Sequence, residues 1–296
     1  MKIWKKITIS AMTLLSITSL AACSSQKNSN QTQNSKPKTS ESTVKKSDSK
    51  INLIDWTKKA TDLYNKDKSD IDNISKHKEY YKVVSPSITT NQNPNLPESW
   101  VSYSELDAQG RAGAVSGLVT QTLVKEHKAQ GRPNFASNLI IAGEKNPAQF
   151  VSGKWSKLPH SKSNNKEVDI KFGDQSYHGW LYNKSHLFGW SLGGDMEAHN
   201  LILGTRGQNV GSNNSKDPGG MSYIETKTRN YVYQNKDAKV LYTAIPVYQN
   251  NELLPRAVYV EAIDINNPSQ FSMATWTINQ QAGVKIDYET GQASNK

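Results

Sequence analysis

In the N-terminal half of the chain, apolar residues recur at helical intervals. Residues 51–64 show this period and 69–81 continue it, which predicts either a peripheral helical hairpin or a helical extension that precedes the main domain. Three prolines between Pro86 and Pro97 indicate a linker. The most regular helical pattern runs from Ser104, a candidate cap, to Lys128. Its apolar stripe consists of Leu106, Ala112, Val115, Leu118, Leu123 and Val124.

The C-terminal half contains shorter apolar runs, which predict strands. They occupy residues 138–142, 168–172, 177–182, 240–248, 257–265 and 271–278. Pro246 places a sheet edge or a bulge in the fourth run. A further helix is expected at 217–235. This order of helices and strands predicts an α+β fold with a central antiparallel sheet and flanking helices, and not a doubly wound parallel sheet.

The N-terminus reads as an export signal. A basic start precedes the apolar run 7–20, which is shorter than the ~20 apolar residues of a membrane span. The run closes on Leu20-Ala21-Ala22-Cys23, which resembles a bacterial lipobox. Residues 1–22 are therefore expected to be a lipoprotein signal peptide, and Cys23 a lipidated residue on the outer face of the cell membrane, either kept there or shed. The alternative is an ordinary cleaved signal followed by a chance cysteine.

The residues after the signal carry much of the positive charge. Residues 23–50 are polar and lysine-rich and predict a disordered tether. The formal net charge of the whole chain is +10, but three lysines lie in 1–22 and an excess of four positive charges lies in 23–50, which leaves +3. The pI is therefore no argument for nucleic-acid binding. Residues 51–97 are expected to form a helical extension and linker, and 98–296 the main domain.

Residues 177–225 bring together groups that suit phosphodiester hydrolysis. His186 follows a short strand, an asparagine-rich run extends from Asn200 to Asn209, and Glu225 lies on the predicted helix. An imidazole can take a proton from water, while amide and carboxylate oxygens can hold a hard cation. Lys184 and Arg206 flank these groups and can face phosphate.

The order of these groups resembles that of the DNA/RNA non-specific endonucleases of the ββα-metal (His-Me finger) class. The likeness is strongest to streptococcal secreted DNases (streptodornases) and to DNA-uptake nucleases. It rests on Lys184-Ser185-His186, on the run 200–209, on Met221 to Glu225 and on the upstream stretch Trp100 to Arg111. The resemblance implies a ββα-metal finger site and a product with a 5′-phosphate.

By this resemblance His186 is the general base, with His178 and His199 as rivals in the sequence. Asn209 is the expected ligand of Mg²⁺, with Mn²⁺ as an alternative, and Asn200 supports the same metal site. Both asparagines could instead belong to loops or helix caps.

Glu225 is expected to bind the metal through water or to hold His186 or Arg206 in place. Its alternative is a solvated ion pair with Arg229, four residues later.

Lys184, Arg206 and Arg111 are the candidate contacts to the nucleic-acid backbone. Many relatives have arginine at the position of Lys184, and lysine cannot form the two-pronged contact that arginine makes with phosphate. Lowered activity, or a compensating role of Arg206, is therefore expected. For Arg111 an ion pair with Asp107 or Glu105 is an equally good interpretation.

Two functional hypotheses follow. The first is an extracellular, metal-dependent endonuclease of DNA, with RNA as an open alternative, that has little sequence preference. The second is a surface lipoprotein that binds DNA on the same scaffold without cutting it. A third interpretation, a solute-binding lipoprotein, lacks the expected two-lobed α/β pattern. No protein partner can be inferred from the sequence.

Overall fold

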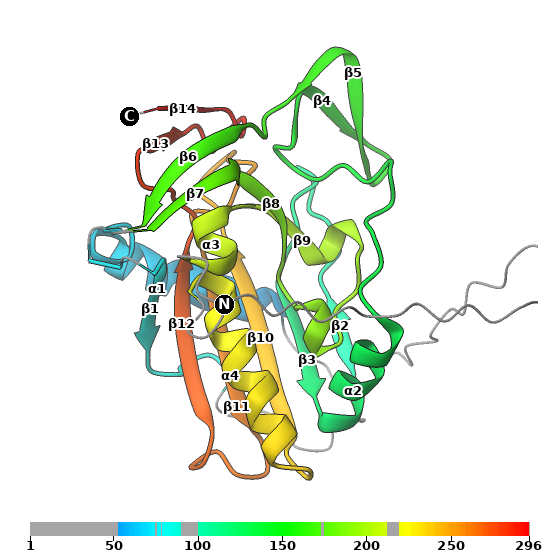
Figure 1. Cartoon of the computed structure of the whole chain (residues 1–296), viewed down its shortest axis with the longest axis vertical. Helices are drawn as coiled ribbons and strands as arrows, with labels where there is room; N and C mark the ends of the chain where they lie inside the picture. Colours follow the sequence, from blue (N-terminus) through cyan, green and yellow to red (C-terminus); the bar gives the residue numbers. More distant parts are fainter. Residues whose placement is uncertain are drawn as a thin grey trace, which may run out of the picture. The chain divides into compact units, whose positions relative to one another are not determined.

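A six-stranded antiparallel sheet forms the centre of the fold (Figure 1). Its strands lie in the order β1 (Tyr81–Val84), β12 (Ser272–Ile278), β11 (Ala257–Asp264), β10 (Val240–Val247), β3 (Val115–Val119) and β2 (Val101–Tyr103). This sheet confirms the predicted α+β class. The computed structural model describes residues 53–74, 76–77, 79–89, 100–172, 175–211 and 219–295, so the predicted signal, Cys23, the tether and most of the predicted linker lie outside the described residues.

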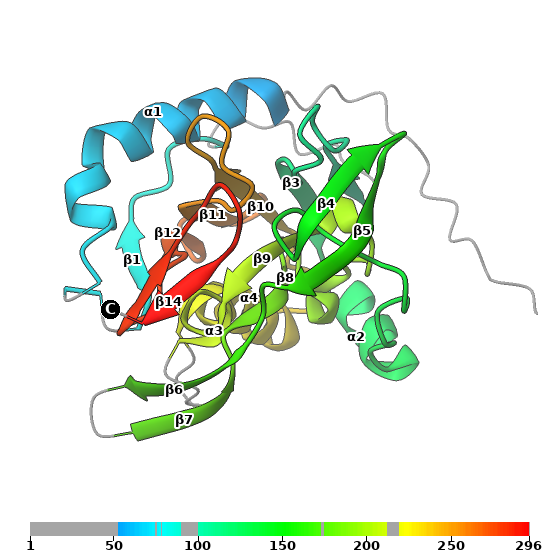
Figure 2. The ribbon, with the colours of Figure 1, turned by 90° about the horizontal axis from the view of Figure 1, so that it is seen from above.

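Helices cover both faces of the sheet (Figure 2). Helix α4 (Gly220–Gln234) packs on one face, where Ile224 and Val232 join Tyr242 and Val260 of the sheet in one buried cluster. Helix α1 (Leu53–Ile71) packs on the other face. There Trp56, Ala60 and Tyr64 meet Ile245, Tyr259 and Trp276. Strands β10 and β11 are buried along their whole length because both faces of the sheet are covered.

The described residues between 53 and 89 belong to this core. The structure has one helix, α1, and then strand β1, where the sequence predicted a helical hairpin. Strand β1 pairs with β12 from Tyr81 to Val84. The N-terminal segment therefore supplies an edge strand and one covering layer of the sheet, and it is not peripheral.

The predicted helix from Ser104 to Lys128 is wrong over most of its length. The chain instead forms β2, a loop, β3 and then the shorter helix α2 (Gln121–Gln130), which Thr120 caps by accepting a hydrogen bond from Leu123 N. All five residues of β3 are buried, so its apolar pattern fits a helix and a central strand equally well. Pairing with β2 and β10 decides for the strand, and Gly117 lets Phe188 pack against it, because a Cβ atom there would lie 2.7 Å from the Phe188 ring.

The C-terminal predictions are closer to the structure. The runs 240–248, 257–265 and 271–278 are confirmed as β10, β11 and β12, and helix 217–235 is confirmed as α4 among its described residues. Strand β10 is central, yet β3 pairs only with its residues 240–244, so Pro246 has a paired strand on one side alone. This local edge explains how a proline is tolerated there.

Several hairpins complete the fold. They are formed by β4 (Lys145–Val151) with β5 (Lys154–Ser163), β6 (Glu167–Phe172) with β7 (Gln175–Trp180), and β13 (Val284–Ile286) with β14 (Ala293–Asn295). The strand predicted at 138–142 is wrong, because these residues form an irregular loop with a turn at each end. Ile141 N donates to the Glu144 carboxylate at 3.1 Å. A side chain thus accepts the hydrogen bond that a neighbouring strand would accept in a sheet. Among the described helices, none has the length and apolar content needed to span a bilayer.

Candidate active site

Two short strands and a helix build the site. Strand β8 (Tyr182–His186) pairs with β9 (Leu201–Thr205), and helix α3 (Arg206–Val210) follows directly. The loop between the strands contains the 3-10 helices η1 (Trp190–Leu192) and η2 (Ala198–Asn200). Within this loop the main chain at Gly194 packs closely against that of Phe188, since a Cβ on Gly194 would lie 1.8 Å from Phe188 O. The arrangement is the strand–strand–helix finger that the sequence predicted.

His186 ends β8 in an enclosed position. The residue is 8% exposed, its ring stacks on Phe135 with centroids 5.7 Å apart, and its Nε2 lies 3.2 Å from Met196 Sδ. Burial and, to a smaller extent, the positive charge of Arg132 lower the pKa of His186 to about 4, against the opposite effect of Asp195. The imidazole is therefore neutral at neutral pH and able to accept a proton.

Asn209 lies on α3 beside the same strand. Ser185 Oγ donates a hydrogen bond to Asn209 Oδ1 at 3.1 Å, and Ser222 Oγ of α4 donates to the main-chain oxygen of Asn209 at 3.1 Å. One bond thus holds the half-buried side-chain amide, and the other holds the main chain of the same residue. Its oxygen is a hard donor of the kind that Mg²⁺ prefers.

Glu225 on α4 faces the loop that follows His186. A Cβ on Gly189 would lie 2.8 Å from the Glu225 carboxylate, so the glycine leaves the space that this group occupies. Burial raises the pKa of Glu225 to about 7, against the lowering effects of Arg229 and Arg132. Arg229 donates to Ser191 at 2.9 Å and to Thr226 at 3.1 Å, and the described residues hold no ion pair between Glu225 and Arg229.

Asn200 has a structural place, and its prediction as a metal residue needs correction. The side chain is fully buried. Its Oδ1 accepts from Phe188 N at 2.8 Å, and its Nδ2 donates to Phe188 O at 3.0 Å and to Asp195 O at 2.9 Å. Because these bonds engage both ends of the amide, Asn200 supports the site by fixing the β8–β9 loop and not by binding a metal.

The contacts of Lys184 differ from the phosphate contact that the sequence predicted. Its Nζ lies 3.0 Å from Glu144 Oε1 and donates to Leu139 O at 2.6 Å. Both side chains of the ion pair are 17% exposed. The ammonium therefore joins β8 to the preceding turn, and the structure favours a structural role over phosphate contact.

Arg111 likewise follows its alternative interpretation. Its Nε donates to Asp107 Oδ2 at 2.7 Å, and its Nη1 donates to the main-chain oxygens of Asn250 and Glu252 at 3.0 Å each. The guanidinium also lies 4.6 Å from the ring centroid of Tyr248. These contacts fix two loops together, so the prediction of a nucleic-acid contact is corrected to a structural ion pair.

Arg206 opens helix α3 and places its guanidinium 5.0 Å from the ring centroid of Tyr177. The rival histidines occupy other positions. His178 is exposed and lies 2.8 Å from Asp169, whereas His199 Nε2 lies 2.7 Å from Asp195 Oδ2. Burial lowers the pKa of His199, but the hydrogen bond and the charge of Asp195 outweigh it and raise the pKa overall. His199 thus supports Asp195, which contacts His186 in turn.

The sequence did not indicate two neighbours of His186, namely Arg132 and Phe135. Arg132 lies 5.3 Å from the centroid of Phe135, which stacks on His186. Both residues follow the glycine that ends α2, a place where the sequence signals only a helix stop. Their separation from His186 along the chain leaves no local pattern that could have revealed the contact.

The donor set around His186 fits a divalent cation held by few protein atoms. The described residues contain no group of three or more histidine, cysteine, aspartate or glutamate side chains placed to hold a metal. The candidate donors are the Asn209 amide oxygen and the Glu225 carboxylate. Mg²⁺ commonly takes one or two protein ligands and completes its shell with water and substrate phosphate.

Comparisons with known proteins agree with this geometry. Residues 150–266 match the family of DNA/RNA non-specific endonucleases. A deoxyribonuclease of Streptococcus dysgalactiae subsp. equisimilis is 33% identical over 201 residues, which cover 64% of this chain and 59% of the relative. The chain thus spans less than two thirds of that protein.

Solved structures extend the likeness to the fold. The structure of Sda1 nuclease with bound zinc ion is 31% identical, with a TM-score of 0.65, and the match covers 76% of this chain and 99% of that one. NucA from Streptococcus agalactiae with magnesium ion bound is 21% identical, with a TM-score of 0.52 and coverage of 72% and 85%, respectively. The second match supports the fold alone.

Proposed function

We propose that this chain, which belongs to the DNA/RNA non-specific endonuclease family, is a metal-dependent endonuclease that hydrolyses DNA with little sequence preference. One observation carries the proposal. The finger of β8, β9 and α3 carries a buried neutral imidazole, His186, directly after the residue whose hydroxyl holds the Asn209 amide oxygen, and the Glu225 carboxylate packs against Gly189 in the loop that follows. A proton acceptor and hard oxygen donors are the groups that hydrolysis of a phosphodiester requires.

His186 takes the proton of the attacking water in this proposal. Its low pKa keeps the ring unprotonated at neutral pH, so no proton has to be removed before the reaction. Met196 Sδ now lies where water would approach Nε2. The unbranched methionine side chain can change rotamer to admit water.

Asn209 would hold the metal through Oδ1, with Ser185 fixing the orientation of the amide. A bound cation would supply positive charge to the phosphate as negative charge develops on it. We infer Mg²⁺ as the natural ion, with Mn²⁺ as an alternative, because one amide oxygen suits a cation that keeps most of its waters. The neighbouring structures contain zinc in Sda1 and magnesium in NucA, so a metal series is part of the test.

Contacts to the nucleic acid are assigned to Arg206 and Arg132. Arg132 is exposed and its charge reaches both His186 and Glu225, which places it at the reacting groups. Binding through the sugar-phosphate backbone would give little sequence preference and would admit RNA as well as DNA.

The place of action is proposed from the sequence. Lipidation of Cys23 would anchor the domain to the outer face of the bacterial membrane, with residues 23–50 as its tether. Cys23→Ser should move the full chain from the membrane fraction into the medium. Equal distribution of parent and variant would contradict the anchor.

The function is tested by cleavage of supercoiled plasmid by the full chain, with Mg²⁺, Mn²⁺, Zn²⁺ or EDTA. The parent should nick and then degrade DNA only when a metal is present. His186→Ala should lower the rate by about 10²–10⁴-fold, the usual contribution of a general base. His178→Ala, an exposed histidine outside the site, serves as the matched control and should cut like the parent.

Binding of DNA without cleavage, with every metal, would overturn the proposal and favour a DNA-binding lipoprotein. Full activity of His186→Ala would overturn the assignment of the base.

A further inference from the structure

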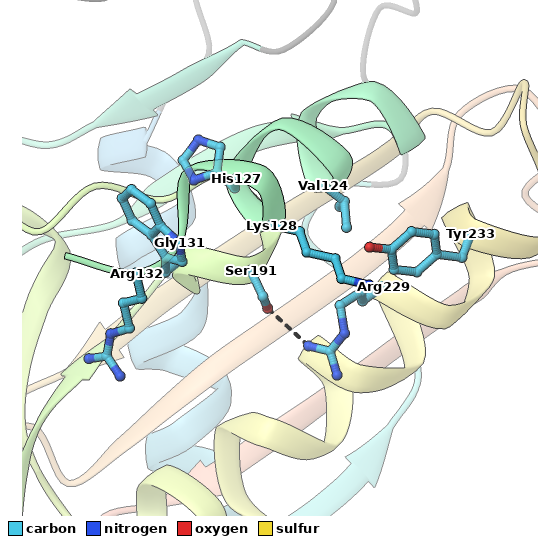
Figure 3. Close-up of a pocket in the computed structure, with 9 residues that line it drawn as sticks. Val124, His127, Lys128, Gly131, Arg132, Ser191, Arg229 and Tyr233 are labelled. Carbon is cyan, nitrogen blue, oxygen red and sulfur yellow. Dashed lines mark hydrogen bonds between the residues drawn. The ribbon is translucent and has the colours of Figure 1, made fainter. Parts of the chain in front are cut away.

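A separate pocket lies beside the candidate active site (Figure 3). Its volume is about 320 Å³. Helix α2, the glycine turn after it, η1 and α4 all contribute to its wall. The residues that matter here are Val124, Lys128, Arg132, Trp190, Arg229 and Tyr233. Of these residues, only Arg132 has a role in the function proposed above.

Three cations line the pocket without a neutralising carboxylate. The lining contains no aspartate or glutamate, and within the described residues Lys128, Arg132 and Arg229 form no ion pair. Arg229 donates to the neutral hydroxyl groups of Ser191 and Thr226. Lys184 and Arg111, by contrast, are engaged by Glu144 and Asp107. Unneutralised charge around a concave site favours an anionic ligand.

The remaining wall is apolar and aromatic. Trp190, Tyr233 and Val124 provide flat or branched surfaces. The ring of His127 lies 4.5 Å from that of Trp190, at an angle of 56°, and thus supports the indole from α2. Aromatic walls next to cations accept nucleobases together with their phosphates, since every base has a face that can stack.

The pocket approaches the candidate active site through Arg132. The guanidinium of Arg132 lies 5.3 Å from the ring centroid of Phe135, and this ring stacks on His186. Arg229 follows Glu225 by one helical turn, and Trp190 follows His186 by four residues. In Figure 3, Lys128, Arg229 and Tyr233 converge at one end, and Arg132 lies at the other. A strand bound at His186 can therefore extend into the pocket past Arg132.

We propose that this pocket binds one unpaired nucleotide of the substrate strand next to the phosphate that is cut, with its base against Trp190 and its own phosphate against Lys128 and Arg229. This inference rests on the proposed nuclease function and specifies its substrate. Pockets for small ligands range from about 300 to 1,000 Å³, so this volume suits a single nucleotide and excludes a base-paired duplex. The enzyme would thus prefer single-stranded, nicked or frayed nucleic acid.

The test measures binding without cleavage. The full chain is titrated in EDTA against a short labelled oligonucleotide, either single-stranded or annealed to its complement, and fluorescence anisotropy is recorded. Trp190→Leu should weaken binding of the single strand by about tenfold, the usual effect of losing one stacked base, and should leave duplex binding nearly unchanged.

Lys128→Ala should reduce the slope of log affinity against log salt by about 0.7 for the single strand, as expected for one lost phosphate contact. Lys125→Ala is the matched control, because this exposed lysine of α2 contacts Gln121 and does not line the pocket. Lys125→Ala should leave the affinity for single strands and the salt slope close to those of the parent, because an exposed charge away from the site contributes little. Circular dichroism confirms that Trp190→Leu is folded, and Lys128→Ala tests the idea at an exposed position in any case.

Single-strand binding that is unchanged in both pocket variants would overturn the inference, and so would an equal loss for single strand and duplex. Failure here can be told apart from failure of the proposed function. If plasmid is cut normally while the pocket variants bind like the parent, only the pocket assignment fails. If no metal supports cleavage while Trp190→Leu still loses single-strand binding, the nuclease proposal fails and the pocket remains a nucleotide site.

Discussion

Ser185 donates a hydrogen bond to the side-chain oxygen of Asn209, 3.1 Å away, and so couples the strand that ends in His186 to the helix that carries the candidate metal ligand. The bond leaves Oδ1 with one further lone pair for a cation and fixes its direction. Base and ligand are thus positioned by adjacent residues of one strand.

Ser185→Ala should therefore weaken metal binding more than it weakens catalysis. Loss of one hydrogen bond of about 1 kcal/mol corresponds to roughly a fivefold rise in the metal concentration at half-maximal activity. The rate at saturating metal should change less. The measurement is plasmid cleavage over a series of Mg²⁺ concentrations. An unchanged metal requirement would show that the bond does not orient the ligand.

Glu225→Gln should remove the contribution of Glu225 to the pH dependence of the free energy of unfolding. The carboxyl has a pKa of about 7 in the folded protein against an ordinary value of 4.5, so between these two values the folded state keeps its proton while the unfolded state releases it. Stability from this group therefore falls as the pH rises through that interval. The free energy of unfolding is measured with urea in EDTA for both proteins. The value for Glu225→Gln should exceed that of the parent by an amount that grows from pH 5 to pH 8.

His186 titrates in the opposite sense, because its pKa of about 4 makes the unfolded state the better proton acceptor. This contribution is present in parent and variant alike, and the difference between them isolates Glu225. A difference in unfolding free energy between Glu225→Gln and the parent that stays constant with pH would contradict the raised pKa of Glu225.

Lys184 should behave as a structural residue. Lys184→Met and Glu144→Gln should each lower the free energy of unfolding by about 1–3 kcal/mol, because each leaves a half-buried partner unsatisfied. The double variant should lose less than the sum of the two, since the residues are in contact. Lys184→Arg should not raise kcat/KM. A stable Lys184→Met variant with a much lower kcat would instead place the ammonium at the substrate.

Arg111→Ala should affect folding and not DNA affinity. The guanidinium joins Asp107 to the main chain of Asn250 and Glu252, so its loss should lower the midpoint of urea unfolding. A residue that contacts phosphate contributes about 0.9 to the salt slope of duplex binding. The slope of Arg111→Ala should equal that of the parent, and a reduced slope would restore the role in binding.

The sequence by itself determined the parts of this protein that depend on neighbouring residues. The apolar runs between 240 and 278 specify the central strands, because strands covered on both faces are apolar along most of their length. The turn at Lys184-Ser185-His186 and the order of Asn209 and Glu225 were sufficient to indicate the family and the location of the site.

The tertiary structure alone decided which side chains those residues meet. The helical pattern across Val115–Val119 became a strand because β2 and β10 lie on either side of it and Phe188 leaves no room at Gly117. Lys184 forms its ion pair with Glu144, and Arg132, which follows the C-terminal end of α2, acts on His186 through its charge. These contacts join residues distant in the chain, so their energies depend on the packed fold and leave no periodic trace in the sequence.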